Sequence, residues 1–400
     1  MLTPAEADLL IGQHLSCLPI ESLPLAQCFG AVLRENIYAE RDHPPYDRVD
    51  MDGVALASHA VSAGARSFRI QATQAAGDAP LTLAADADCI EVMTGAVLPA
   101  GCDSVVPVEE LAMASGHAGL AANLRVEPWQ NVRRRGSDTR EGTLLLSVGQ
   151  RLHAPEIAIA ASAGMARIRV SSQPMLAVIS TGNELVEPGE PVLAHQVRRS
   201  NAYAIASALR EHGFQRVADD HIHDDVGELR ERLHFHLETH DVLVLTGGVS
   251  VGRFDLVPQV LEELGVRTIF HKVAQRPGKP LWFGTAPSGA AVFALPGRPV
   301  SSLVCLRRYV LPALWAGLGQ SPVPARRIAL AAPVSVKPPL THFIAVRVQE
   351  DESGRDWAVP IPADSSGDAM PLAGTDGFVE LPPGPNVYPK GFVTRLYRWF

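Results

Sequence analysis

LTGGVSVGRFD, residues 245–255, is the segment from which the fold class of this chain follows most directly. It begins at the end of an apolar run, passes through Gly247, Gly248 and Gly252, and reaches Asp255 just before an amphipathic stretch. A buried strand that runs through glycines into a helix forms a loop whose backbone N–H groups can surround an oxyanion. We therefore expect a phosphate-binding loop here. Asp255 is either a ligand of magnesium or ribose, or the N-cap of the following helix.

Strands and helices alternate on both sides of this loop. Predicted strands lie at residues 175–180, 241–245, 268–273, 281–284 and 291–295, and predicted helices at residues 201–212, 225–240, 256–264 and 300–318. This alternation is typical of a doubly wound α/β domain with a mostly parallel sheet. Such sheets bind ligands beyond the carboxyl ends of their strands, so the candidate site lies at that edge.

The regions that flank this α/β domain have different patterns. Thr3-Pro4-Ala5-Glu6 combines a capping box with an early helical proline and predicts an opening helix as far as about Leu18. Residues 39–138 predict a mainly β insert, and proline-broken strands after Ser321 predict a small β-barrel-like domain. The chain is thus predicted to be a multidomain protein of α/β plus β class. The predicted domains are residues 1–41 with 136–173, residues 42–135, residues 174–319 and residues 320–400.

The composition is that of a soluble globular protein, with 46% hydrophobic and 20% charged residues. A net charge of −8 and a pI near 6.0 argue against nucleic acid or an anionic membrane as the main partner. The N-terminus lacks the features of a secretory signal, and no apolar run is long enough to span a bilayer, so we expect a cytoplasmic protein. The scattered cysteines form no CxxC pair, which argues against a disulfide framework or a thiolate zinc site.

Other loops carry charged residues to the same predicted edge of the sheet. STGNEL places Glu184 after the first strand, and KVAQRPGKP brings Lys272, Arg276 and Lys279 around a Pro-Gly turn. LPGRPVS, residues 295–301, adds a rigid turn before a helix. Cations beside a glycine loop are a common way to hold a phosphate or another oxyanion. Taken singly, each motif is equally compatible with a solvated surface loop.

The predicted insert contains acidic and polar turns as well. Asp52 lies in MDG, Thr94 in MTG and Asp138 in RRGSD. Asp-Gly and similar pairs are frequent in ordinary turns, so these tripeptides alone assign no function.

Two pairs of histidines, His221 with His223 and His234 with His236, lie near several acidic residues and resemble metal ligands. The first pair belongs to a short predicted strand, and the second lies two residues apart on a predicted helix, where the side chains face different ways. The structural interpretation is therefore favoured over a metal site.

Taken in order, MDG, MTG, RRGSD, STGNEL, TGGVSVGRFD, RPGKP and LPGRPVS resemble the motifs of the MoeA family, the molybdopterin molybdenumtransferases, which includes the E domain of gephyrin. The match runs from about Pro44 to Ser301. The resemblance implies an elongated homodimer with a cleft between the α/β domain of one subunit and the β insert of its partner. It also implies an enzyme of molybdenum cofactor biosynthesis that inserts molybdate into adenylylated molybdopterin and releases AMP in a Mg²⁺-dependent step.

The resemblance assigns site residues to both sides of this cleft. The catalytic residues are expected to be Asp52, Glu184 and Asp255, of which Glu184 and Asp255 bind Mg²⁺. The expected substrate-binding residues are Thr94, Asp138, Thr181, Gly247, Gly248, Ser250, Gly252, Lys272, Arg276, Lys279, Pro296, Gly297 and Ser301. This assignment agrees with simple chemistry, since carboxylate oxygens suit magnesium and cations suit a tetrahedral dianion.

Two other functions stay open at this point. A non-catalytic scaffold or chaperone that holds the cofactor is one, because the segment around Asp52, at positions 47–55, and the last domain depart from the family pattern. An adenylyltransferase-like enzyme is the other, because the α/β domain also resembles molybdopterin adenylyltransferase. The expected partners are a second copy of the chain, the adenylyltransferase and the molybdoenzymes that accept the product.

Overall fold

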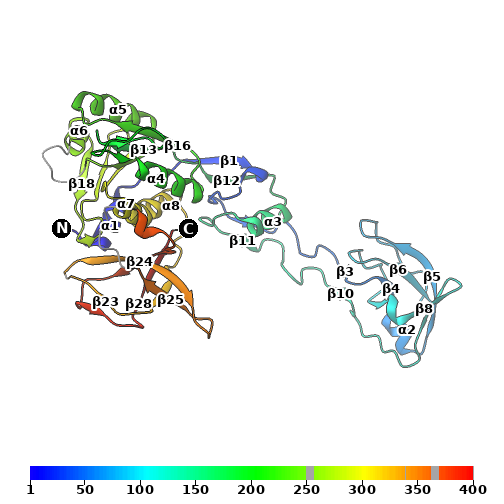
Figure 1. The fold of residues 1–400 in the computed structure, drawn as a ribbon. Coiled ribbons are helices and arrows are strands. Elements are labelled where there is room, and N and C mark those ends of the chain that lie inside the picture. The colour runs from blue at the N-terminus through cyan, green and yellow to red at the C-terminus, as the bar shows by residue number, and fades with distance from the viewer. Residues whose placement is uncertain (249–255, 338, 362–368, 400) are drawn as a thin grey trace.

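The computed structural model describes residues 1–248, 256–337, 339–361 and 369–399. The molecule is elongated (Figure 1). Both termini, the α/β region and a C-terminal barrel lie at one end, and the β insert lies at the other. A smaller middle region joins the two ends. Within the described residues, no helix is long and apolar enough to cross a membrane.

The α/β region is built on a six-stranded sheet with the order β16-β13-β17-β21-β20-β18. Its strands are β13 Leu176–Thr181, β16 Val217–Ile222, β17 Val242–Thr246, β18 Arg267–His271, β20 Trp282–Thr285 and β21 Ala291–Leu295. Strands β16, β13, β17 and β21 are parallel, while β20 is antiparallel to both β21 and β18. Strand β18 therefore runs in the same direction as the central strands. The predicted α/β class with a mostly parallel sheet is confirmed.

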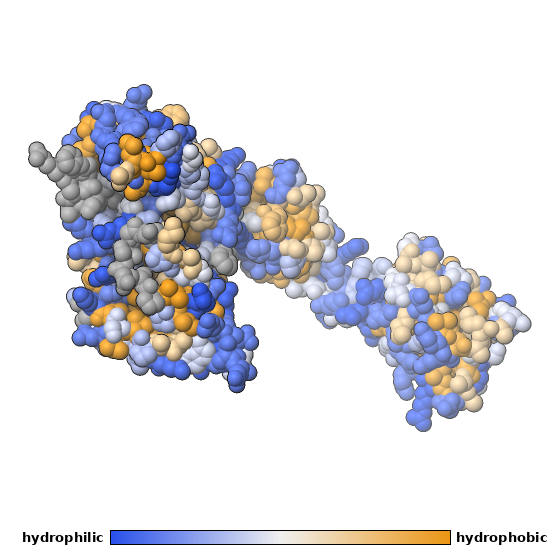
Figure 2. All heavy atoms as spheres, viewed as in Figure 1, coloured by the Kyte–Doolittle hydropathy of each residue, from blue (hydrophilic) through white to orange (hydrophobic). Residues whose placement is uncertain are grey.

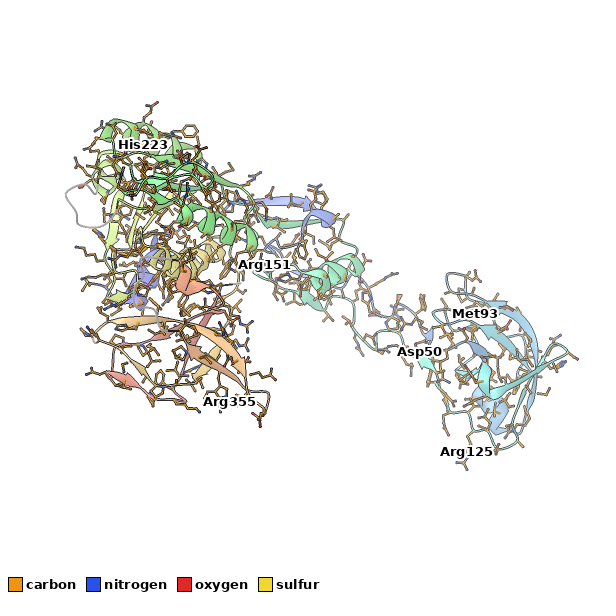
Figure 3. The ribbon with its side chains drawn as sticks, in the orientation of Figure 1. Asp50, Met93, Arg125, Arg151, His223 and Arg355 are labelled. Carbon is orange, nitrogen blue, oxygen red and sulfur yellow. The ribbon has the colours of Figure 1, made fainter. Side chains whose placement is uncertain are left out.

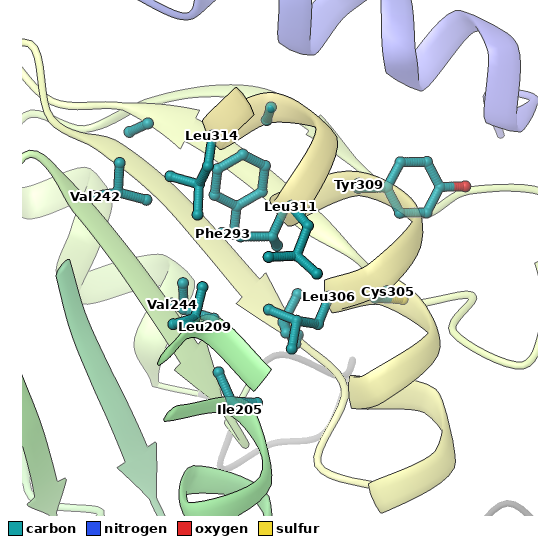
Figure 4. Close-up of a cluster of buried hydrophobic side chains, with 14 of the residues drawn as sticks. Ile205, Leu209, Val242, Val244, Phe293, Cys305, Leu306, Tyr309, Leu311 and Leu314 are labelled. Carbon is teal, nitrogen blue, oxygen red and sulfur yellow. The ribbon is translucent and has the colours of Figure 1, made fainter. Parts of the chain in front are cut away.

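Helices cover both faces of this sheet. They are α4 Ser200–Glu211, α5 Val226–Thr239, α6 Val257–Glu263, α7 Pro299–Cys305 and α8 Leu311–Gly317. One face packs its apolar side chains against α4, α7 and α8, and the other packs against α5 and α6. Figure 4 shows Leu311 and Leu314 beside Phe293 and Val242 on the first face. Burial of each such side chain contributes about 1.5–3 kcal/mol, which makes this the main core of the protein.

The predicted helix at residues 300–318 is interrupted. A π turn, Leu306–Val310, separates α7 from α8. Pro312 has no N–H to donate to the carbonyl of Arg308, so the regular α-helical ladder cannot pass through this position. The local pattern of apolar residues continues through the π turn, and for that reason the sequence predicted one helix.

The opening helix α1, Pro4–His14, has the predicted capping box between Thr3 and Glu6. It ends earlier than the predicted Leu18, because Leu15 is already extended. The amide of Leu18 donates to the carbonyl of Gly317 at 2.9 Å. Contact with α8 therefore replaces the last helical turn.

The middle region combines two distant parts of the chain. Strand β1 Ile20–Pro24 pairs with β12 Arg167–Ser171, and β2 Ile37–Tyr38 pairs with β11 Leu144–Leu146. Helix α3, Ala154–Ser162, covers these strands. Arg151 joins this region to α4, since its guanidinium donates to the carbonyl of His212 at 2.9 Å. The exact domain limits given above remain predictions.

The insert is a second six-stranded sheet, with the order β7-β4-β6-β5-β9-β8. Its elements are β4 Gly53–Leu56, α2 Ser58–Ser62, β5 Ser67–Gln74, β6 Asp88–Val92, β7 Ser104–Pro107, β8 Leu111–Ala114 and β9 His117–Leu120. A short antiparallel pair, β3 Arg48–Val49 with β10 Val132–Arg133, leads into and out of it. The mainly β character is as predicted.

The C-terminal region is a closed barrel of five strands. The strands pair in the order β22-β28-β26-β24-β25, and β25 pairs in turn with β22, which closes the barrel. Its strands are β22 Arg327–Leu330, β24 Thr341–Glu350, β25 Asp356–Pro360, β26 Gly377–Leu381 and β28 Val393–Arg398, with β23 Val334–Ser335 and β27 Val387–Tyr388 as an outer pair. The small β19, Gln275–Arg276, pairs with β24 and joins the barrel to the α/β region. The predicted barrel-like domain is confirmed.

Candidate functional site

Three loop residues meet at the carboxyl edge of the α/β sheet. A Cβ on Gly247, whose φ is +100°, would lie 2.4 Å from the carbonyl oxygen of Thr181, so only glycine lets the two strand ends approach this closely. A Cβ on Gly297 would lie 3.6 Å from the Cα of Gly247. The loops after β13, β17 and β21 are therefore packed backbone against backbone. Gly248 follows Gly247 in the chain and Pro296 precedes Gly297, and both were also predicted to be site residues.

Asn201, in the first turn of α4, links two of these loops. Its amide Nδ2 donates to Thr246 Oγ1 at 2.9 Å and to the carbonyl of Gly297 at 2.8 Å. The hydroxyl of Ser302 donates to the carbonyl of Pro296 and lies 3.3 Å from Thr246 Oγ1. The sequence motifs do not include Asn201. The feature of the sequence that could have indicated Asn201 is a polar amide at the start of the helix that follows the first strand of the α/β sheet.

Two predicted substrate-binding hydroxyls have different surroundings. Thr181 is 3% exposed and its Oγ1 has no hydrogen-bond partner among the described residues. A Cβ on Gly248 would lie 2.8 Å from this oxygen, so the hydroxyl lies beneath the glycine turn. Ser301 is 3% exposed and lies inside α7. The free hydroxyl of Thr181 is thus the better placed of the two for a ligand held by the turn.

Glu184 lies in an exposed turn directly after β13. A Cβ on Gly182 would lie 2.6 Å from Glu184 Oε2, so the carboxylate folds back over the α-carbon of Gly182. In the described part of the chain, this carboxylate accepts no hydrogen bond and forms no ion pair. It is therefore available to a ligand.

The three predicted cations belong to the loop between β18 and β20. This loop lies at the same edge as the glycine turn, because β18 runs parallel to the central strands. Lys272 has a φ of +76°, which is strained for a residue with a side chain and is a common feature of functional loops. Lys272, Arg276 and Lys279 form no ion pair within the described residues. Their charge is therefore not neutralised locally.

Gln275 supports this loop from inside. It is fully buried, its Nε2 donates to the carbonyl of Gly278 at 3.1 Å, and its Oε1 accepts from the hydroxyl of Tyr309. The amide of Val273 donates to the carbonyl of Lys279 at 2.9 Å. The loop is thus closed by its own backbone and connected to the π turn by Gln275, a role that the sequence motifs do not indicate.

In the insert, the structure brings Asp52 and Thr94 together. Asp52 Oδ1 accepts from the backbone amide of Thr94 at 2.6 Å and from its hydroxyl at 2.7 Å. These bonds, the backbone one first, lower the pKa of Asp52 below its ordinary value. A Cβ on Gly53 would lie 2.0 Å from the carbonyl oxygen of Val106, so the glycine of MDG is required by the close pairing of β4 and β7.

Asp138 is held separately. It accepts from Arg133 Nε at 2.9 Å and from Ser137 Oγ at 3.1 Å, and its backbone amide donates to the carbonyl of His43. The hydrogen bond from Arg133 lowers the pKa of Asp138. Among the described residues, no hydrogen bond connects Asp138 to the pair formed by Asp52 and Thr94.

Within one chain, the two groups of predicted site residues lie far apart. Asp50 and Met93, the near neighbours of Asp52 and Thr94, lie in the insert, whereas His223 lies in the α/β region at the other end of the molecule (Figure 3). Ser250, Gly252 and Asp255 lie outside the described residues. The predicted partnership of Asp255 with Glu184 therefore stays a prediction.

The cavity with a volume of about 310 Å³ is at the opposite edge of the sheet. Leu18, His240 and Ala313 are among the residues that line it, and it lies next to the first residues of β17 and β21.

No group of three or more His, Cys, Asp or Glu residues in the described chain is arranged to hold a metal ion. The charged loops described above thus remain the candidate site.

Comparison with known protein families accounts for nearly the whole chain. Residues 2–164 match the MoeA N-terminal region (domain I and II), residues 177–316 match a probable molybdopterin binding domain, and residues 327–394 match the MoeA C-terminal region (domain IV). The chain belongs to the MoeA family. The predicted family is thereby confirmed, including for the C-terminal domain, where the motif match was weakest.

Individual MoeA-family proteins agree with this assignment. The molybdopterin molybdenumtransferase of Synechocystis is 38% identical over 400 residues, which is 100% of both chains. The molybdopterin molybdenumtransferase of Bacillus subtilis is 29% identical and covers 94% of this chain and 89% of its own. The crystal structure of the molybdopterin biosynthesis MoeA protein from Pyrococcus horikoshii has a TM-score of 0.83 at 28% identity, with 100% and 99% of the two chains covered. Both the elongated shape and the order of the regions are thus MoeA-like.

Proposed function

We propose that this chain is a molybdopterin molybdenumtransferase that inserts molybdenum from molybdate into adenylylated molybdopterin and releases AMP. The observation that carries the proposal is the convergence of Thr181, Gly247, Gly297, Glu184 and the cationic loop at one edge of the α/β sheet. Family membership supports a role in molybdenum cofactor biosynthesis.

The chain's own groups account for binding of the anionic substrates. On sequence grounds, the glycine segment at residues 247–252 supplies backbone amides to a phosphate, and the hydroxyl of Thr181, which lies next to Gly248, donates to the same group. Lys272, Arg276 and Lys279 supply positive charge for the phosphates and for molybdate, and they form no ion pair with an acid among the residues that the structure describes. Arg276 offers a planar fork, whereas the lysines act as compact charges.

Glu184 fits the magnesium ion that the family resemblance implies. Its carboxylate is exposed and accepts no hydrogen bond from the described residues, so its oxygens are available to a hard cation. Asp255 is the second proposed ligand on sequence grounds. Glu184, with Asp255, would hold the magnesium ion, which when bound would supply charge neutralisation for the leaving phosphate.

The insert completes the site only if a second copy of the chain supplies it. Asp52, just before β4, and Thr94, just after β6, lie in the insert, at the other end of the molecule from the α/β region that carries Glu184 (Figure 1), and Asp138 lies in the two-stranded segment that leads to the insert. We propose a homodimer in which the insert of one subunit faces the α/β edge of its partner. On the middle region, Phe29, Tyr38 and Leu144 are exposed. Figure 2 shows hydrophobic residues on the surface of this region, which supports a contact between copies there.

The cellular setting follows from the same proposal. We place the reaction in the cytoplasm, after the molybdopterin adenylyltransferase, which supplies the adenylate, and before the molybdoenzymes that accept the product.

The direct test is AMP release from purified protein with adenylylated molybdopterin, Mg²⁺ and molybdate, with a second reaction that lacks molybdate. Release that depends on molybdate supports the transferase.

Glu184→Gln is expected to slow release by about 100-fold, the order seen when one charge-stabilising group is removed. Glu190→Gln, an exposed acid in the same segment, is the matched control and should stay at the wild-type rate. Tight binding of the adenylate without release would contradict the proposal and favour a scaffold.

A further inference from the structure

The turn that carries Glu184 is held by the neighbouring edge strand β16. The carbonyl of Gly182 accepts a hydrogen bond from His221 Nε2 at 2.9 Å. Next to it, the side-chain oxygen of Asn183 accepts from the backbone amide of Asp224 at 3.0 Å. The segment at the end of β16 thus contacts two successive residues that precede Glu184.

His221 is separate from the buried ionic cluster on the other face of β16. Asp220 points toward α5, where Arg232 and His236 donate to its carboxylate. Side chains alternate along a strand, so His221 points to the opposite face, toward the loop after β13. Its ring centroid lies 5.0 Å from that of His223, which in turn contacts Glu228.

The buried side chain of Arg199 contacts the other end of the loop that carries Glu184. Arg199 is 5% exposed and donates to Ser180 Oγ at 2.9 Å and to the carbonyl of Asp220 at 2.9 Å. The same guanidinium pairs with Glu187 and Asp219. Glu184 therefore lies between a buried arginine, which anchors Glu187, and the imidazole, which anchors Gly182.

The hydrogen bond from His221 to the carbonyl of Gly182 affects the position of the Glu184 carboxylate. The φ of Gly182 is +144°, and the Glu184 carboxylate lies close above its α-carbon. A rotation of the peptide between residues 182 and 183 would therefore displace the carboxylate. Because the carbonyl of Gly182 only accepts, His221 Nε2 must carry the hydrogen in this contact.

We propose that His221 is a positioning residue for the transfer reaction: its Nε2–H holds the carbonyl of Gly182 and thereby aims the Glu184 carboxylate. The inference rests on the proposed function of Glu184. In this role the imidazole acts through the turn, by its hydrogen bond to the carbonyl of Gly182.

The test compares three variants of the full-length protein. His221→Leu removes the donor, His221→Gln keeps an N–H at a similar reach, and His223→Leu is the matched control on the exposed neighbouring histidine, whose side chain is 59% exposed. In the AMP-release assay, His221→Leu should lower kcat by about tenfold or more with KM for the adenylate nearly unchanged. His221→Gln should recover most of kcat, and His223→Leu should match the wild type.

A second measurement needs neither substrate nor magnesium. Amide hydrogen exchange of residues 179–187 should be about fivefold faster in His221→Leu, the factor that corresponds to loss of one net hydrogen bond. The exchange should return toward wild type in His221→Gln and stay unchanged in His223→Leu.

The outcomes separate this inference from the proposed function. If the wild type releases no AMP, or Glu184→Gln is fully active, the proposed role of Glu184 fails. If Glu184→Gln is slow while His221→Leu keeps the wild-type kcat, the positioning role is overturned, even if exchange is faster. It is also overturned if His221→Leu loses kcat without faster exchange, or if His221→Gln recovers exchange but not kcat.

Discussion

The carboxylate of Asp52 receives two hydrogen bonds from one residue, Thr94. One comes from the backbone and survives any substitution except proline, and the other depends on the hydroxyl. Both favour the ionised form, so this acid stays charged at a pH where an ordinary aspartate begins to bind a proton. Thr94 therefore acts on Asp52 whether or not it touches substrate.

Thr94→Val is expected to raise the pKa of Asp52 part of the way back to its ordinary value, because the stronger backbone bond remains. A depressed carboxyl pKa contributes stability above the unfolded pKa, and this contribution is lost as pH falls through the folded pKa. The stability difference between wild type and variant should thus be present at neutral pH and shrink in acid. Carboxyl ¹³C titration of labelled aspartate measures the pKa directly. An unchanged midpoint would show that the hydroxyl bond is unimportant.

The sequence predicted that several candidate site residues follow strand ends at one edge of the sheet, but it did not predict the contacts that support them. Glycine, lysine and carboxylate motifs follow strand ends and can be recognised locally, and Thr181, Gly247 and Glu184 do lie at one edge. Asn201 and His221 act by donating to carbonyl oxygens of other loops, and no local pattern specifies such a contact. Tertiary packing decides it.

Among the secondary-structure elements, the π turn Leu306–Val310 joins three parts of the fold. Arg308, on this turn, is 5% exposed and donates to Asp8 of α1 at 2.7 Å and to Glu380 of β26 at 3.2 Å. Tyr397 donates to the same Glu380 carboxylate at 2.6 Å. The opening helix, the α/β region and the barrel thus share one buried cation.

Arg308→Leu is expected to destabilise the barrel end of the molecule by about 3 kcal/mol, because it leaves Glu380 buried without its cation. The double change with Glu380→Gln should recover part of this loss. Asp8→Asn should cost less than about 1 kcal/mol, since the side chain of Asp8 is 44% exposed and its ion pair is partly screened by solvent. Native-state hydrogen exchange of β26 and β28 measures these differences. Equal losses for Asp8→Asn and Arg308→Leu would contradict this account.

Elements with strong local signals were predictable and long-range pairings were not. Strands β13, β17 and β21 are continuous apolar runs, and the capping box of α1 is plain in the sequence. Helix α3 was missed, although His153, Pro155 and Glu156 mark its start. The pairing of β1 with β12 joins residues that are far apart in the chain, so no short window contains it.

For the whole molecule, the separation of the insert from the α/β edge makes a clear prediction. Asp52→Ala and Glu184→Gln should each be nearly inactive alone. If two copies share each site, mixing and reassociating the two variants at equal amounts should restore about a quarter of wild-type activity, because half of the dimers are mixed and each has one intact site. Activity of the mixture no greater than that of either variant would place both residues in one subunit's site or in none.

The insert is joined to the rest of the chain by two antiparallel segments, in which β3 pairs with β10 and the amide of His43 donates to the carbonyl of Thr139 at 2.7 Å. A two-stranded ribbon is only marginally stable by itself and twists more strongly than a wider sheet. Because the ribbon separates the insert from the rest of the molecule, a small change in the twist of the ribbon would displace Asp52 over a large distance. Substitutions along this ribbon can tune the reach of one subunit toward another while leaving every residue at both ends unchanged.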